Sequence, residues 1–181
     1  MAFAMYLQDY DERLPDRRDL KLSLPGGYRT WSTWPASDPR GGWAEVVLNP
    51  YIKNEAVWSC PSVAGLMGEL AQVSQKTTLE PNSPVARYWL WRFDRPTDPV
   101  ALDNFWGKTE EQAISDLQFA NNPQAGKPQS VSETELALDP YFPRTITAVP
   151  VDLRGKSVHR GGRNRLFLDT HVKYFRDIRT N

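Results

Sequence analysis

The sequence predicts an α+β fold in which a helix comes first along the chain and an antiparallel β-sheet comes last. Three features predict it: apolar residues at helical spacing near the N-terminus, alternating apolar residues near the C-terminus, and 15 Pro with 11 Gly among 181 residues. Because proline and glycine interrupt regular elements, this content excludes a helical bundle and predicts long loops with short extra helices. We expect a single domain over residues 1–181, since a chain of this length forms one hydrophobic core.

The first element that we expect is a helix over residues 1–14, which a proline ends. Tyr6 and Tyr10 share one face of this helix, and Phe3 and Leu7 share a neighbouring face at the same spacing. No Ser, Thr, Asp or Asn stands before the helix to cap its first turn. We therefore expect an upstream part of the same helix in the native gene product.

Short elements separated by loops are expected in the middle of the chain. A helix begins at Trp43 and ends before Pro50, and an extended segment then leads to Cys60. Apolar residues at helical spacing predict a further helix over residues 62–74. Aromatic side chains alternate over residues 86–93, which predicts the best-defined strand of the chain.

Two capping boxes are expected in the second half of the chain. The sequence Thr-Glu-Glu-Gln over residues 109–112 predicts the start of a helix that ends near Asn121. The sequence Ser-Glu-Thr-Glu over residues 132–135 predicts a second helix of one or two turns, which stops before Pro140.

Residues 154–181 are predicted to form an antiparallel β-meander. A turn at Gly161-Gly162 separates its first two strands, and Asp169-Thr170 reverses the chain into its last strand. The helix therefore precedes the sheet in chain order.

Charge gives the chain no general attraction to nucleic acid or to an anionic membrane, because 22 Lys and Arg offset 22 Asp and Glu. The charges are unevenly distributed, however: residues 94–139 hold 9 acidic and 3 basic residues, and residues 154–181 hold 2 acidic and 8 basic ones. The basic stretch with its aromatic residues fits a solvated strand face better than a nucleic-acid site. We expect no nucleic-acid partner.

No motif for catalysis is present, and we expect no enzymatic activity. The chain has no Gly-x-Ser-x-Gly nucleophile elbow and no glycine-rich phosphate loop. Its single cysteine, Cys60, has no partner for an internal disulfide and no basic neighbour in the sequence that would activate it. We expect Cys60 to pack as a small hydrophobic residue.

One polar set of metal-ligand type, His159, Asp169 and His171, is confined to the C-terminal meander. On a strand, an Asp and a His two positions apart face the same side, and a hairpin can bring the second His near them. The turn expected at Asp169 disrupts this geometry, and turn capping with ring packing explains the three residues. We expect no metal and no cofactor, and a metal-dependent enzyme at these residues is the third hypothesis.

Three segments of the chain resemble one known bacterial family, and they occur in its order. They are Met5–Pro15, the stretch of residues 43–61, and the C-terminal pattern His-x9-Asp-Thr-His-Val. The chain resembles the prepilin-type proteins, and in particular the soluble part of a type II secretion pseudopilin. Residues 62–150 add little to the resemblance. The residues that carry it are Asp9, Tyr10, Asp11, Glu12, Cys60, Pro61, His159, Asp169 and His171.

This resemblance implies a pilin-like fold, in which a long N-terminal helix packs on an antiparallel sheet and residues 1–14 are the remnant of that helix. It implies a structural subunit of a type II secretion pseudopilus, or of a related type IV pilus-like envelope filament, that aids protein export. Its partners would be other pilin-like subunits and proteins of the secretion machinery. The upstream helix would anchor the native protein in the inner membrane, with the head on the periplasmic or cell-surface side. Some pseudopilins carry calcium, although no clear calcium motif is present here.

One residue departs from the family pattern, and one alternative function stays open. Thr170 stands where the family has glycine, and because a β-branched residue resists positive φ, we expect a different turn. The alternative is a secreted glycan- or surface-binding module that uses the tryptophan-rich loop of residues 31–43, although covering of the core explains Trp31 and Trp34.

Overall fold

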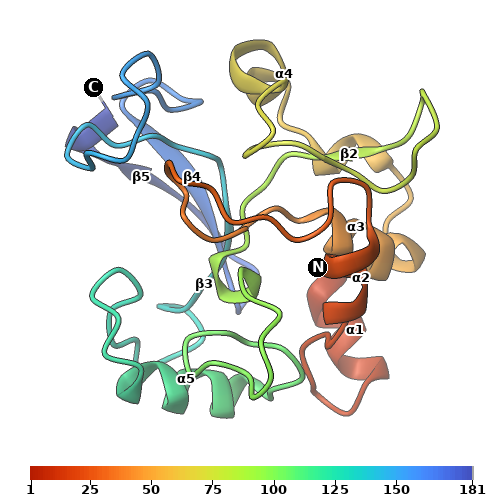
Figure 1. Ribbon diagram of the computed structural model, residues 1–181. Helices are drawn as coiled ribbons and strands as arrows, with labels where there is room; N and C mark the ends of the chain where they lie inside the picture. The colour runs from red at the N-terminus through yellow and green to blue at the C-terminus, as the bar shows by residue number, and fades with distance from the viewer. Residues whose placement is uncertain (181) are drawn as a thin grey trace.

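A computed structural model of the protein describes residues 1–180 and has an α+β fold, as predicted, with a short N-terminal helix and small antiparallel sheets (Figure 1). The α-helices are α1 (Ala2–Asp9), α2 (Arg18–Ser23), α3 (Gly42–Leu48), α4 (Pro61–Met67) and α5 (Glu110–Phe119). The strands are β1 (Gln75–Lys76), β2 (Val85–Ala86), β3 (Glu135–Leu138), β4 (Gly162–Phe167) and β5 (Val172–Arg176). Short 3-10 helices cover Asn49–Tyr51, Glu55–Trp58, Trp91–Phe93 and Ile178–Thr180. Among residues 1–180, no helix is both long and apolar enough to cross a lipid bilayer.

The larger sheet has the strand order β3-β4-β5, and both of its strand pairs are antiparallel (Figure 1). Leu138 of β3 and Lys173 of β5 both lie opposite Arg165 of β4. Every residue of β5 is exposed, so this strand forms an uncovered edge of the sheet. Strands β1 and β2 pair separately.

The C-terminal meander differs from its prediction at the first turn. Gly162 is the first residue of β4 and not part of the turn. A Cβ atom at this position would stand 2.2 Å from the carbonyl oxygen of Phe175, so glycine allows β5 to pair closely with β4 here. The strand predicted before it is reduced to isolated bridges, one of them between His159 and Gly162. Asp169 and Thr170 reverse the chain between β4 and β5, as predicted.

Helix α1 ends at Asp9 and is shorter than the predicted helix over residues 1–14. Asp11 and Glu12 have φ angles of 50° and 58°, which turn the chain out of the helix. The backbone N–H of Leu14 then donates to the carbonyl oxygen of Lys108 at 2.9 Å, and the Leu14 side chain is buried. This pairing with a distant segment replaces the last helical turn.

Helix α1 packs against α3 and the 3-10 helix Asn49–Tyr51. Phe3 and Tyr6 are buried, as the helical pattern predicts, and Leu7 is half-buried. Tyr10, which the helical spacing places on the same face as Tyr6, is 53% exposed. Its ring stacks on the outer side of Tyr6 at a centroid distance of 4.1 Å.

Two further helix predictions are confirmed and one is shortened. The helix predicted to begin at Trp43 is α3, and the predicted capping box at Thr109 starts α5. In this box the Thr109 hydroxyl accepts the backbone N–H of Gln112, and the Gln112 side chain accepts the backbone N–H of Thr109. Helix α4 ends at Met67, although the pattern predicts a helix to residue 74. The segment expected to be extended before Cys60 contains 3-10 turns instead.

The predicted strand over residues 86–93 is wrong. Only Val85–Ala86 forms a strand, Trp89 makes isolated bridges, and Trp91–Phe93 is a 3-10 turn. The alternating side chains serve two apolar clusters: Trp89 packs with Phe142 and Val158, whereas Leu90 and Phe93 pack with Trp43 and Trp106. Phe93, which alternation would place on the side of Trp89, joins the cluster of Leu90 because the 3-10 turn redirects it.

The second predicted capping box, at residues 132–135, is also wrong. Glu135 begins β3, in which Leu136 and Leu138 are buried. Pairing with β4 supplies the backbone hydrogen bonds that a short helix would have made locally.

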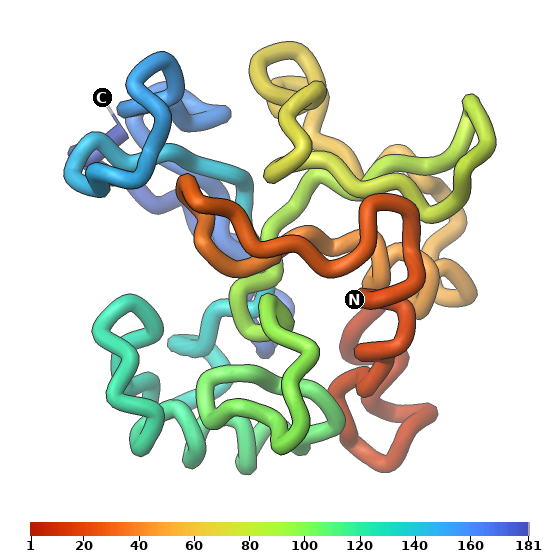
Figure 2. Tube along the Cα trace, in the orientation of Figure 1, coloured from red at the N-terminus to blue at the C-terminus, as the bar shows by residue number. Residues whose placement is uncertain are grey.

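The tryptophan-rich loop crosses the molecule from α2 towards the C-terminal sheet and returns to α3 (Figure 2). Its contact there is made by Trp34, whose backbone N–H donates to Ala148 and whose indole Nε1 donates to the carbonyl oxygen of Tyr141 at 3.2 Å. Trp43, at the end of the loop, is fully buried. The loop therefore covers part of the core, as expected.

Candidate functional site

An apolar pocket of about 430 Å³ lies between the N-terminal helices and the larger sheet. Phe3, Leu48 and Trp58 line it from the helical part of the chain, and strands β3 and β4 contribute Leu138 and Leu166. Walls of this kind, with a few polar groups among them, are typical of binding pockets.

Three polar residues of the pocket wall come from distant parts of the chain: Cys60, Asp139 and His159. Cys60 is the N-cap residue of α4, Asp139 follows the last residue of β3, and His159 stands in the segment before β4. The fold thus brings a thiol, a carboxylate and an imidazole to one place.

The donor atoms of these residues converge on a single nitrogen. His159 Nε2 lies 3.2 Å from Asp139 Oδ2 and 3.9 Å from Cys60 Sγ. One ligand atom from each residue lies within 4.8 Å of the other two. The Asp139 side chain is 2% exposed and the His159 side chain 32% exposed. Of these two side chains, solvent therefore contacts mainly the imidazole of His159.

The backbone holds the carboxylate of Asp139 in place. Its Oδ2 atom accepts the backbone N–H of Asn164 at 2.9 Å, and the backbone N–H of Asp139 donates to the carbonyl oxygen of Asn164 at 3.1 Å. Tyr88 also lines the pocket, and burial, followed by the nearby Asp139 and Cys60, raises the pKa of Tyr88 to about 12. Its phenol is therefore protonated at neutral pH.

The arrangement differs from the nucleophile relay of a cysteine hydrolase. Such a relay uses the two ring nitrogens of a histidine separately, one for the cysteine and one for the orienting carboxylate. Here the same atom, His159 Nε2, faces both Cys60 and Asp139. Three donors that meet at one point match the requirements of a metal ion instead.

The candidate set weighed in the sequence analysis, His159, Asp169 and His171, is not assembled, in line with the expectation that a turn at Asp169 prevents it. Asp169 Oδ1 lies 2.6 Å from Nδ1 of His171 and accepts its backbone N–H at 3.2 Å, and the His171 ring stacks on Phe167. Turn capping and ring packing are thus confirmed for these two residues. His159 instead joins Cys60 and Asp139, the one three-residue group of metal-ligand type found in residues 1–180.

Sequence reasoning missed this group for a definable reason. Cys60 and His159 are 99 residues apart, so no local spacing joins them. Cys60 has no basic neighbour along the sequence, but the fold places the imidazole of His159 beside its thiol. Asp139 was read only as the end of a short helix. Asp139 directly follows the last residue of β3, and a correct prediction of this strand would have marked Asp139 as a candidate site residue.

The other residues of the resemblance lie at the end of α1, in the turn after it and at the start of α4. Asp9 Oδ2 accepts the Tyr51 hydroxyl at 2.7 Å, and this hydrogen bond raises the pKa of Tyr51 to about 12. Tyr10 stacks on Tyr6, and Asp11 and Glu12 form the turn after α1. Pro61 follows Cys60 as the first residue of α4.

Known proteins add no assignment, because no protein-family model, curated protein or solved structure matches the chain.

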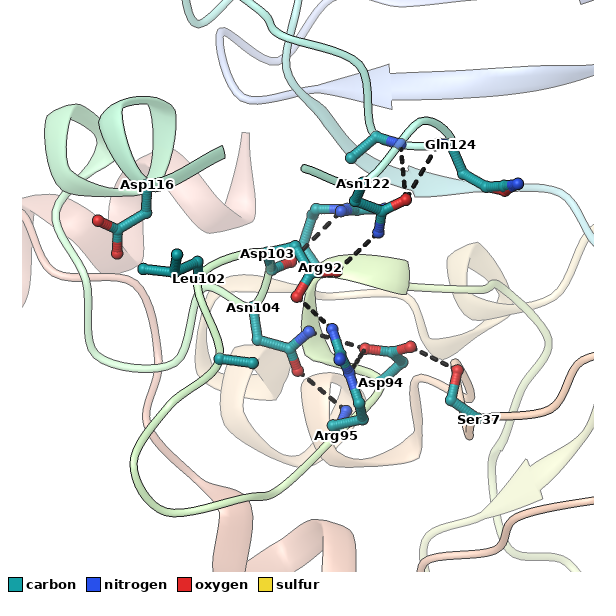
Figure 3. A network of polar contacts seen from close by, with 12 residues as sticks. Ser37, Arg92, Asp94, Arg95, Leu102, Asp103, Asn104, Asp116, Asn122 and Gln124 are labelled. Carbon is teal, nitrogen blue, oxygen red and sulfur yellow. Dashed lines mark hydrogen bonds and ion pairs between the residues drawn. The ribbon is translucent and has the colours of Figure 1, made fainter. Parts of the chain in front are cut away.

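A second cavity, of about 730 Å³, is polar and lies beside the tryptophan-rich loop. Trp34 and Trp91 line it together with a network of charged and amide side chains (Figure 3). In this network Asp94 accepts hydrogen bonds from Ser37 and Asn104, and Asp103 accepts one from Asn122. Arg95 forms ion pairs with both carboxylates.

Proposed function

We propose that the protein is a structural subunit of a type II secretion pseudopilus or of a related pilus-like envelope filament. The observation that carries the proposal is the spatial relation of the three segments that resemble prepilin-type proteins. Asp9 of the first segment contacts Tyr51 of the second, and Cys60 of the second contacts His159 of the third. These contacts make the three segments neighbours in the fold, which is compatible with a common role in one structural unit.

The turn between β4 and β5 supports the same proposal. Thr170 has a φ angle of 69°, so the expectation that a β-branched residue would avoid this conformation is wrong. Glycine adopts positive φ at the lowest cost, and glycine is what the family has at this place. The backbone of the turn is thus suited to the residue that the resemblance implies.

Two exposed surfaces suit contacts between subunits. Met1, the residue before α1, and Met5, within α1, lie four positions apart and are 83% and 42% exposed. The edge strand β5 exposes Val172 and Tyr174 beside Lys173, and an open strand edge is a template for pairing with another chain. In the proposed filament these surfaces contact neighbouring pilin-like subunits and the secretion machinery, on the periplasmic or outer side of the inner membrane.

The test uses the native gene in its own cells. Surface filaments are sheared off and tested for the protein with an antibody raised against this chain, and the antibody is applied to whole cells in electron microscopy. We expect labelled filaments, and fewer of them in a Lys173→Glu variant than in a Lys127→Glu control in the polar linker. If the protein is recovered only as a free monomer outside the cells, the proposal is wrong.

A glycan-binding module is the second candidate, and the second cavity favours it. Sugars bind by stacking on aromatic rings and by hydrogen bonds to carboxylate, amide and guanidinium groups, and this cavity offers Trp34 and Trp91 beside such groups. A glycan array distinguishes the candidates. Binding that Trp34→Ala abolishes would favour the module, provided that Trp31→Ala, in the same loop but outside the cavity wall, keeps it.

A further inference from the structure

The convergence of Cys60, Asp139 and His159 has a chemical consequence beyond assembly. A thiolate, a carboxylate and an imidazole are each ligands of zinc, and their combination suits zinc better than calcium or magnesium, which prefer oxygen ligands. We propose that these three side chains bind one Zn²⁺ ion in the wall of the apolar pocket.

The distances fit a tetrahedral ion. Zinc bonds of about 2.3 Å to sulfur and about 2.0 to 2.2 Å to nitrogen and oxygen set neighbouring ligand atoms roughly 3.3 to 3.8 Å apart. The observed separations from His159 Nε2 are 3.2 Å to Asp139 Oδ2 and 3.9 Å to Cys60 Sγ. The third separation, between Cys60 Sγ and the Asp139 carboxylate, is at most 4.8 Å, so side-chain movements of no more than about 1 Å complete the site.

The surroundings hold the ligands in position. Asp139 is buried and fixed by the N–H of Asn164, which is the kind of outer hydrogen bond that orients a ligating carboxylate. His159 presents Nε2 to both partners, so the imidazole needs no rotation to coordinate. Binding replaces the proton of the Cys60 thiol by the ion, and that proton is released to solvent.

Three protein ligands leave the fourth tetrahedral position free. All three residues line the apolar pocket, so a fourth ligand such as water could reach the ion through it. The ion would join the start of α4, the end of β3 and the segment before β4. Zinc would therefore stabilise the fold by linking parts of the chain that no disulfide joins. The proposal does not depend on the filament role.

Cobalt provides a specific probe, because Co²⁺ occupies zinc sites and a thiolate ligand gives it a strong near-ultraviolet charge-transfer band. Cys60 is the single cysteine, so a thiolate band has one origin, and variants of the two histidines separate their contributions. Reduced, metal-free protein is titrated with Co²⁺ and then with Zn²⁺, while gel filtration monitors the monomer. We expect saturation at one equivalent, tetrahedral Co²⁺ bands that Zn²⁺ abolishes, and a higher Tm with zinc.

Variants assign the ligands. Cys60→Ala should abolish the charge-transfer band, and His159→Gln should weaken binding by more than about tenfold. His171→Ala is the matched control, because its ring pairs with Asp169 outside the site, and it should bind like the wild type. Absence of the thiolate band in the wild type, or zinc binding that survives Cys60→Ala and His159→Gln but is lost in His171→Ala, would overturn the proposal. Neither result would bear on whether the protein enters filaments.

Discussion

Arg163 Nη1 donates to Asp177 Oδ2 at 2.7 Å, and both side chains are almost fully buried. The guanidinium group of Arg163 also lies 3.7 Å from the ring centroid of Tyr141. The sequence predicts a solvated strand face for the basic C-terminal stretch. The fold instead pairs Arg163 with Asp177 and Arg165 with Glu135 inside the same chain. These two arginines are thus engaged within the molecule, and Arg165 pairs directly with the acidic segment.

Removal of the Arg163 side chain should destabilise the protein strongly. Arg163→Ala leaves Asp177 buried with one ion-pair partner fewer, and a broken buried pair typically costs about 3 to 5 kcal/mol. Arg179 still pairs with the same carboxylate, which places the expected loss near the lower end of this range. Urea denaturation measures it, and Lys173→Ala on the exposed strand β5 serves as the control. Equal stability of the two variants would contradict the structural role of the pair.

Acid should weaken the same contact. Hydrogen bonds from Arg179, and then from Arg163, hold the pKa of Asp177 well below its usual range. A depressed carboxyl pKa contributes stability that is fully present above the unfolded value of about 4 and is lost as the pH falls below it. An Asp177→Asn variant should therefore lose less stability than the wild type between pH 5 and pH 3. Parallel curves of Tm against pH for the two proteins would be evidence against this.

Thr170→Gly should stabilise the protein, in contrast to most substitutions by glycine. Thr170 has a φ angle of 69°, where a β-branched residue is strained by about 1 to 2 kcal/mol. Glycine removes this strain but gains conformational freedom in the unfolded chain, so we expect a net gain of roughly 1 kcal/mol. Thr145→Gly, at an exposed position, should lose stability. The difference in unfolding free energy between the two variants tests the argument, and a loss in both would refute it.

The elements that the sequence predicts well depend on neighbouring residues. The capping box at Thr109 and the reversal at Asp169-Thr170 are made by residues within three positions of one another, and both are confirmed. The elements predicted wrongly depend on distant partners. Leu14 leaves the first helix to pair with Lys108, and Glu135 joins a strand because β4 lies beside it.

The candidate site was beyond reach of the sequence for the same reason. The alternating residues 86–93 predict a strand, but the packing of their side chains in two clusters, which the sequence does not show, bends the segment. Cys60 and His159 were both singled out in separate motifs, yet nothing local indicated that they touch. Asp139 completes the group through the pairing of β3 with β4, which was not predicted.

The first helix provides a test that separates its two tyrosines. Tyr6 is 8% exposed and Tyr10 is 53% exposed, although the helical pattern predicts the same face for both. Tyr6→Ala leaves a cavity in the core and should cost on the order of 2 to 5 kcal/mol, whereas Tyr10→Ala should cost less than about 1 kcal/mol. Chemical denaturation of the two variants gives both values. A larger loss for Tyr10→Ala would show that the end of α1 packs differently.

A buried acid in α3 should make the stability depend on pH near neutrality. Glu45 is 3% exposed, and neither of its carboxyl oxygens has a hydrogen-bond partner within the protein. Burial, followed by repulsion from Glu55, raises the pKa of Glu45 to about 7. The folded state therefore favours the protonated acid, whereas the unfolded chain loses this proton at a pH of about 4.5.

The sign of the effect follows from this difference. A raised carboxyl pKa favours the folded state below the unfolded pKa, and this contribution is lost as the pH rises through about 7, at a total cost of roughly 2 to 4 kcal/mol. Glu45→Gln cannot ionise, so its advantage over the wild type should grow from pH 5 to pH 8, while the exposed control Glu69→Gln should follow the wild type at both values. Urea denaturation at these two pH values measures the change. A constant difference between wild type and Glu45→Gln would mean that the carboxyl group finds a charged partner or water in solution, and that its burial does not govern its protonation.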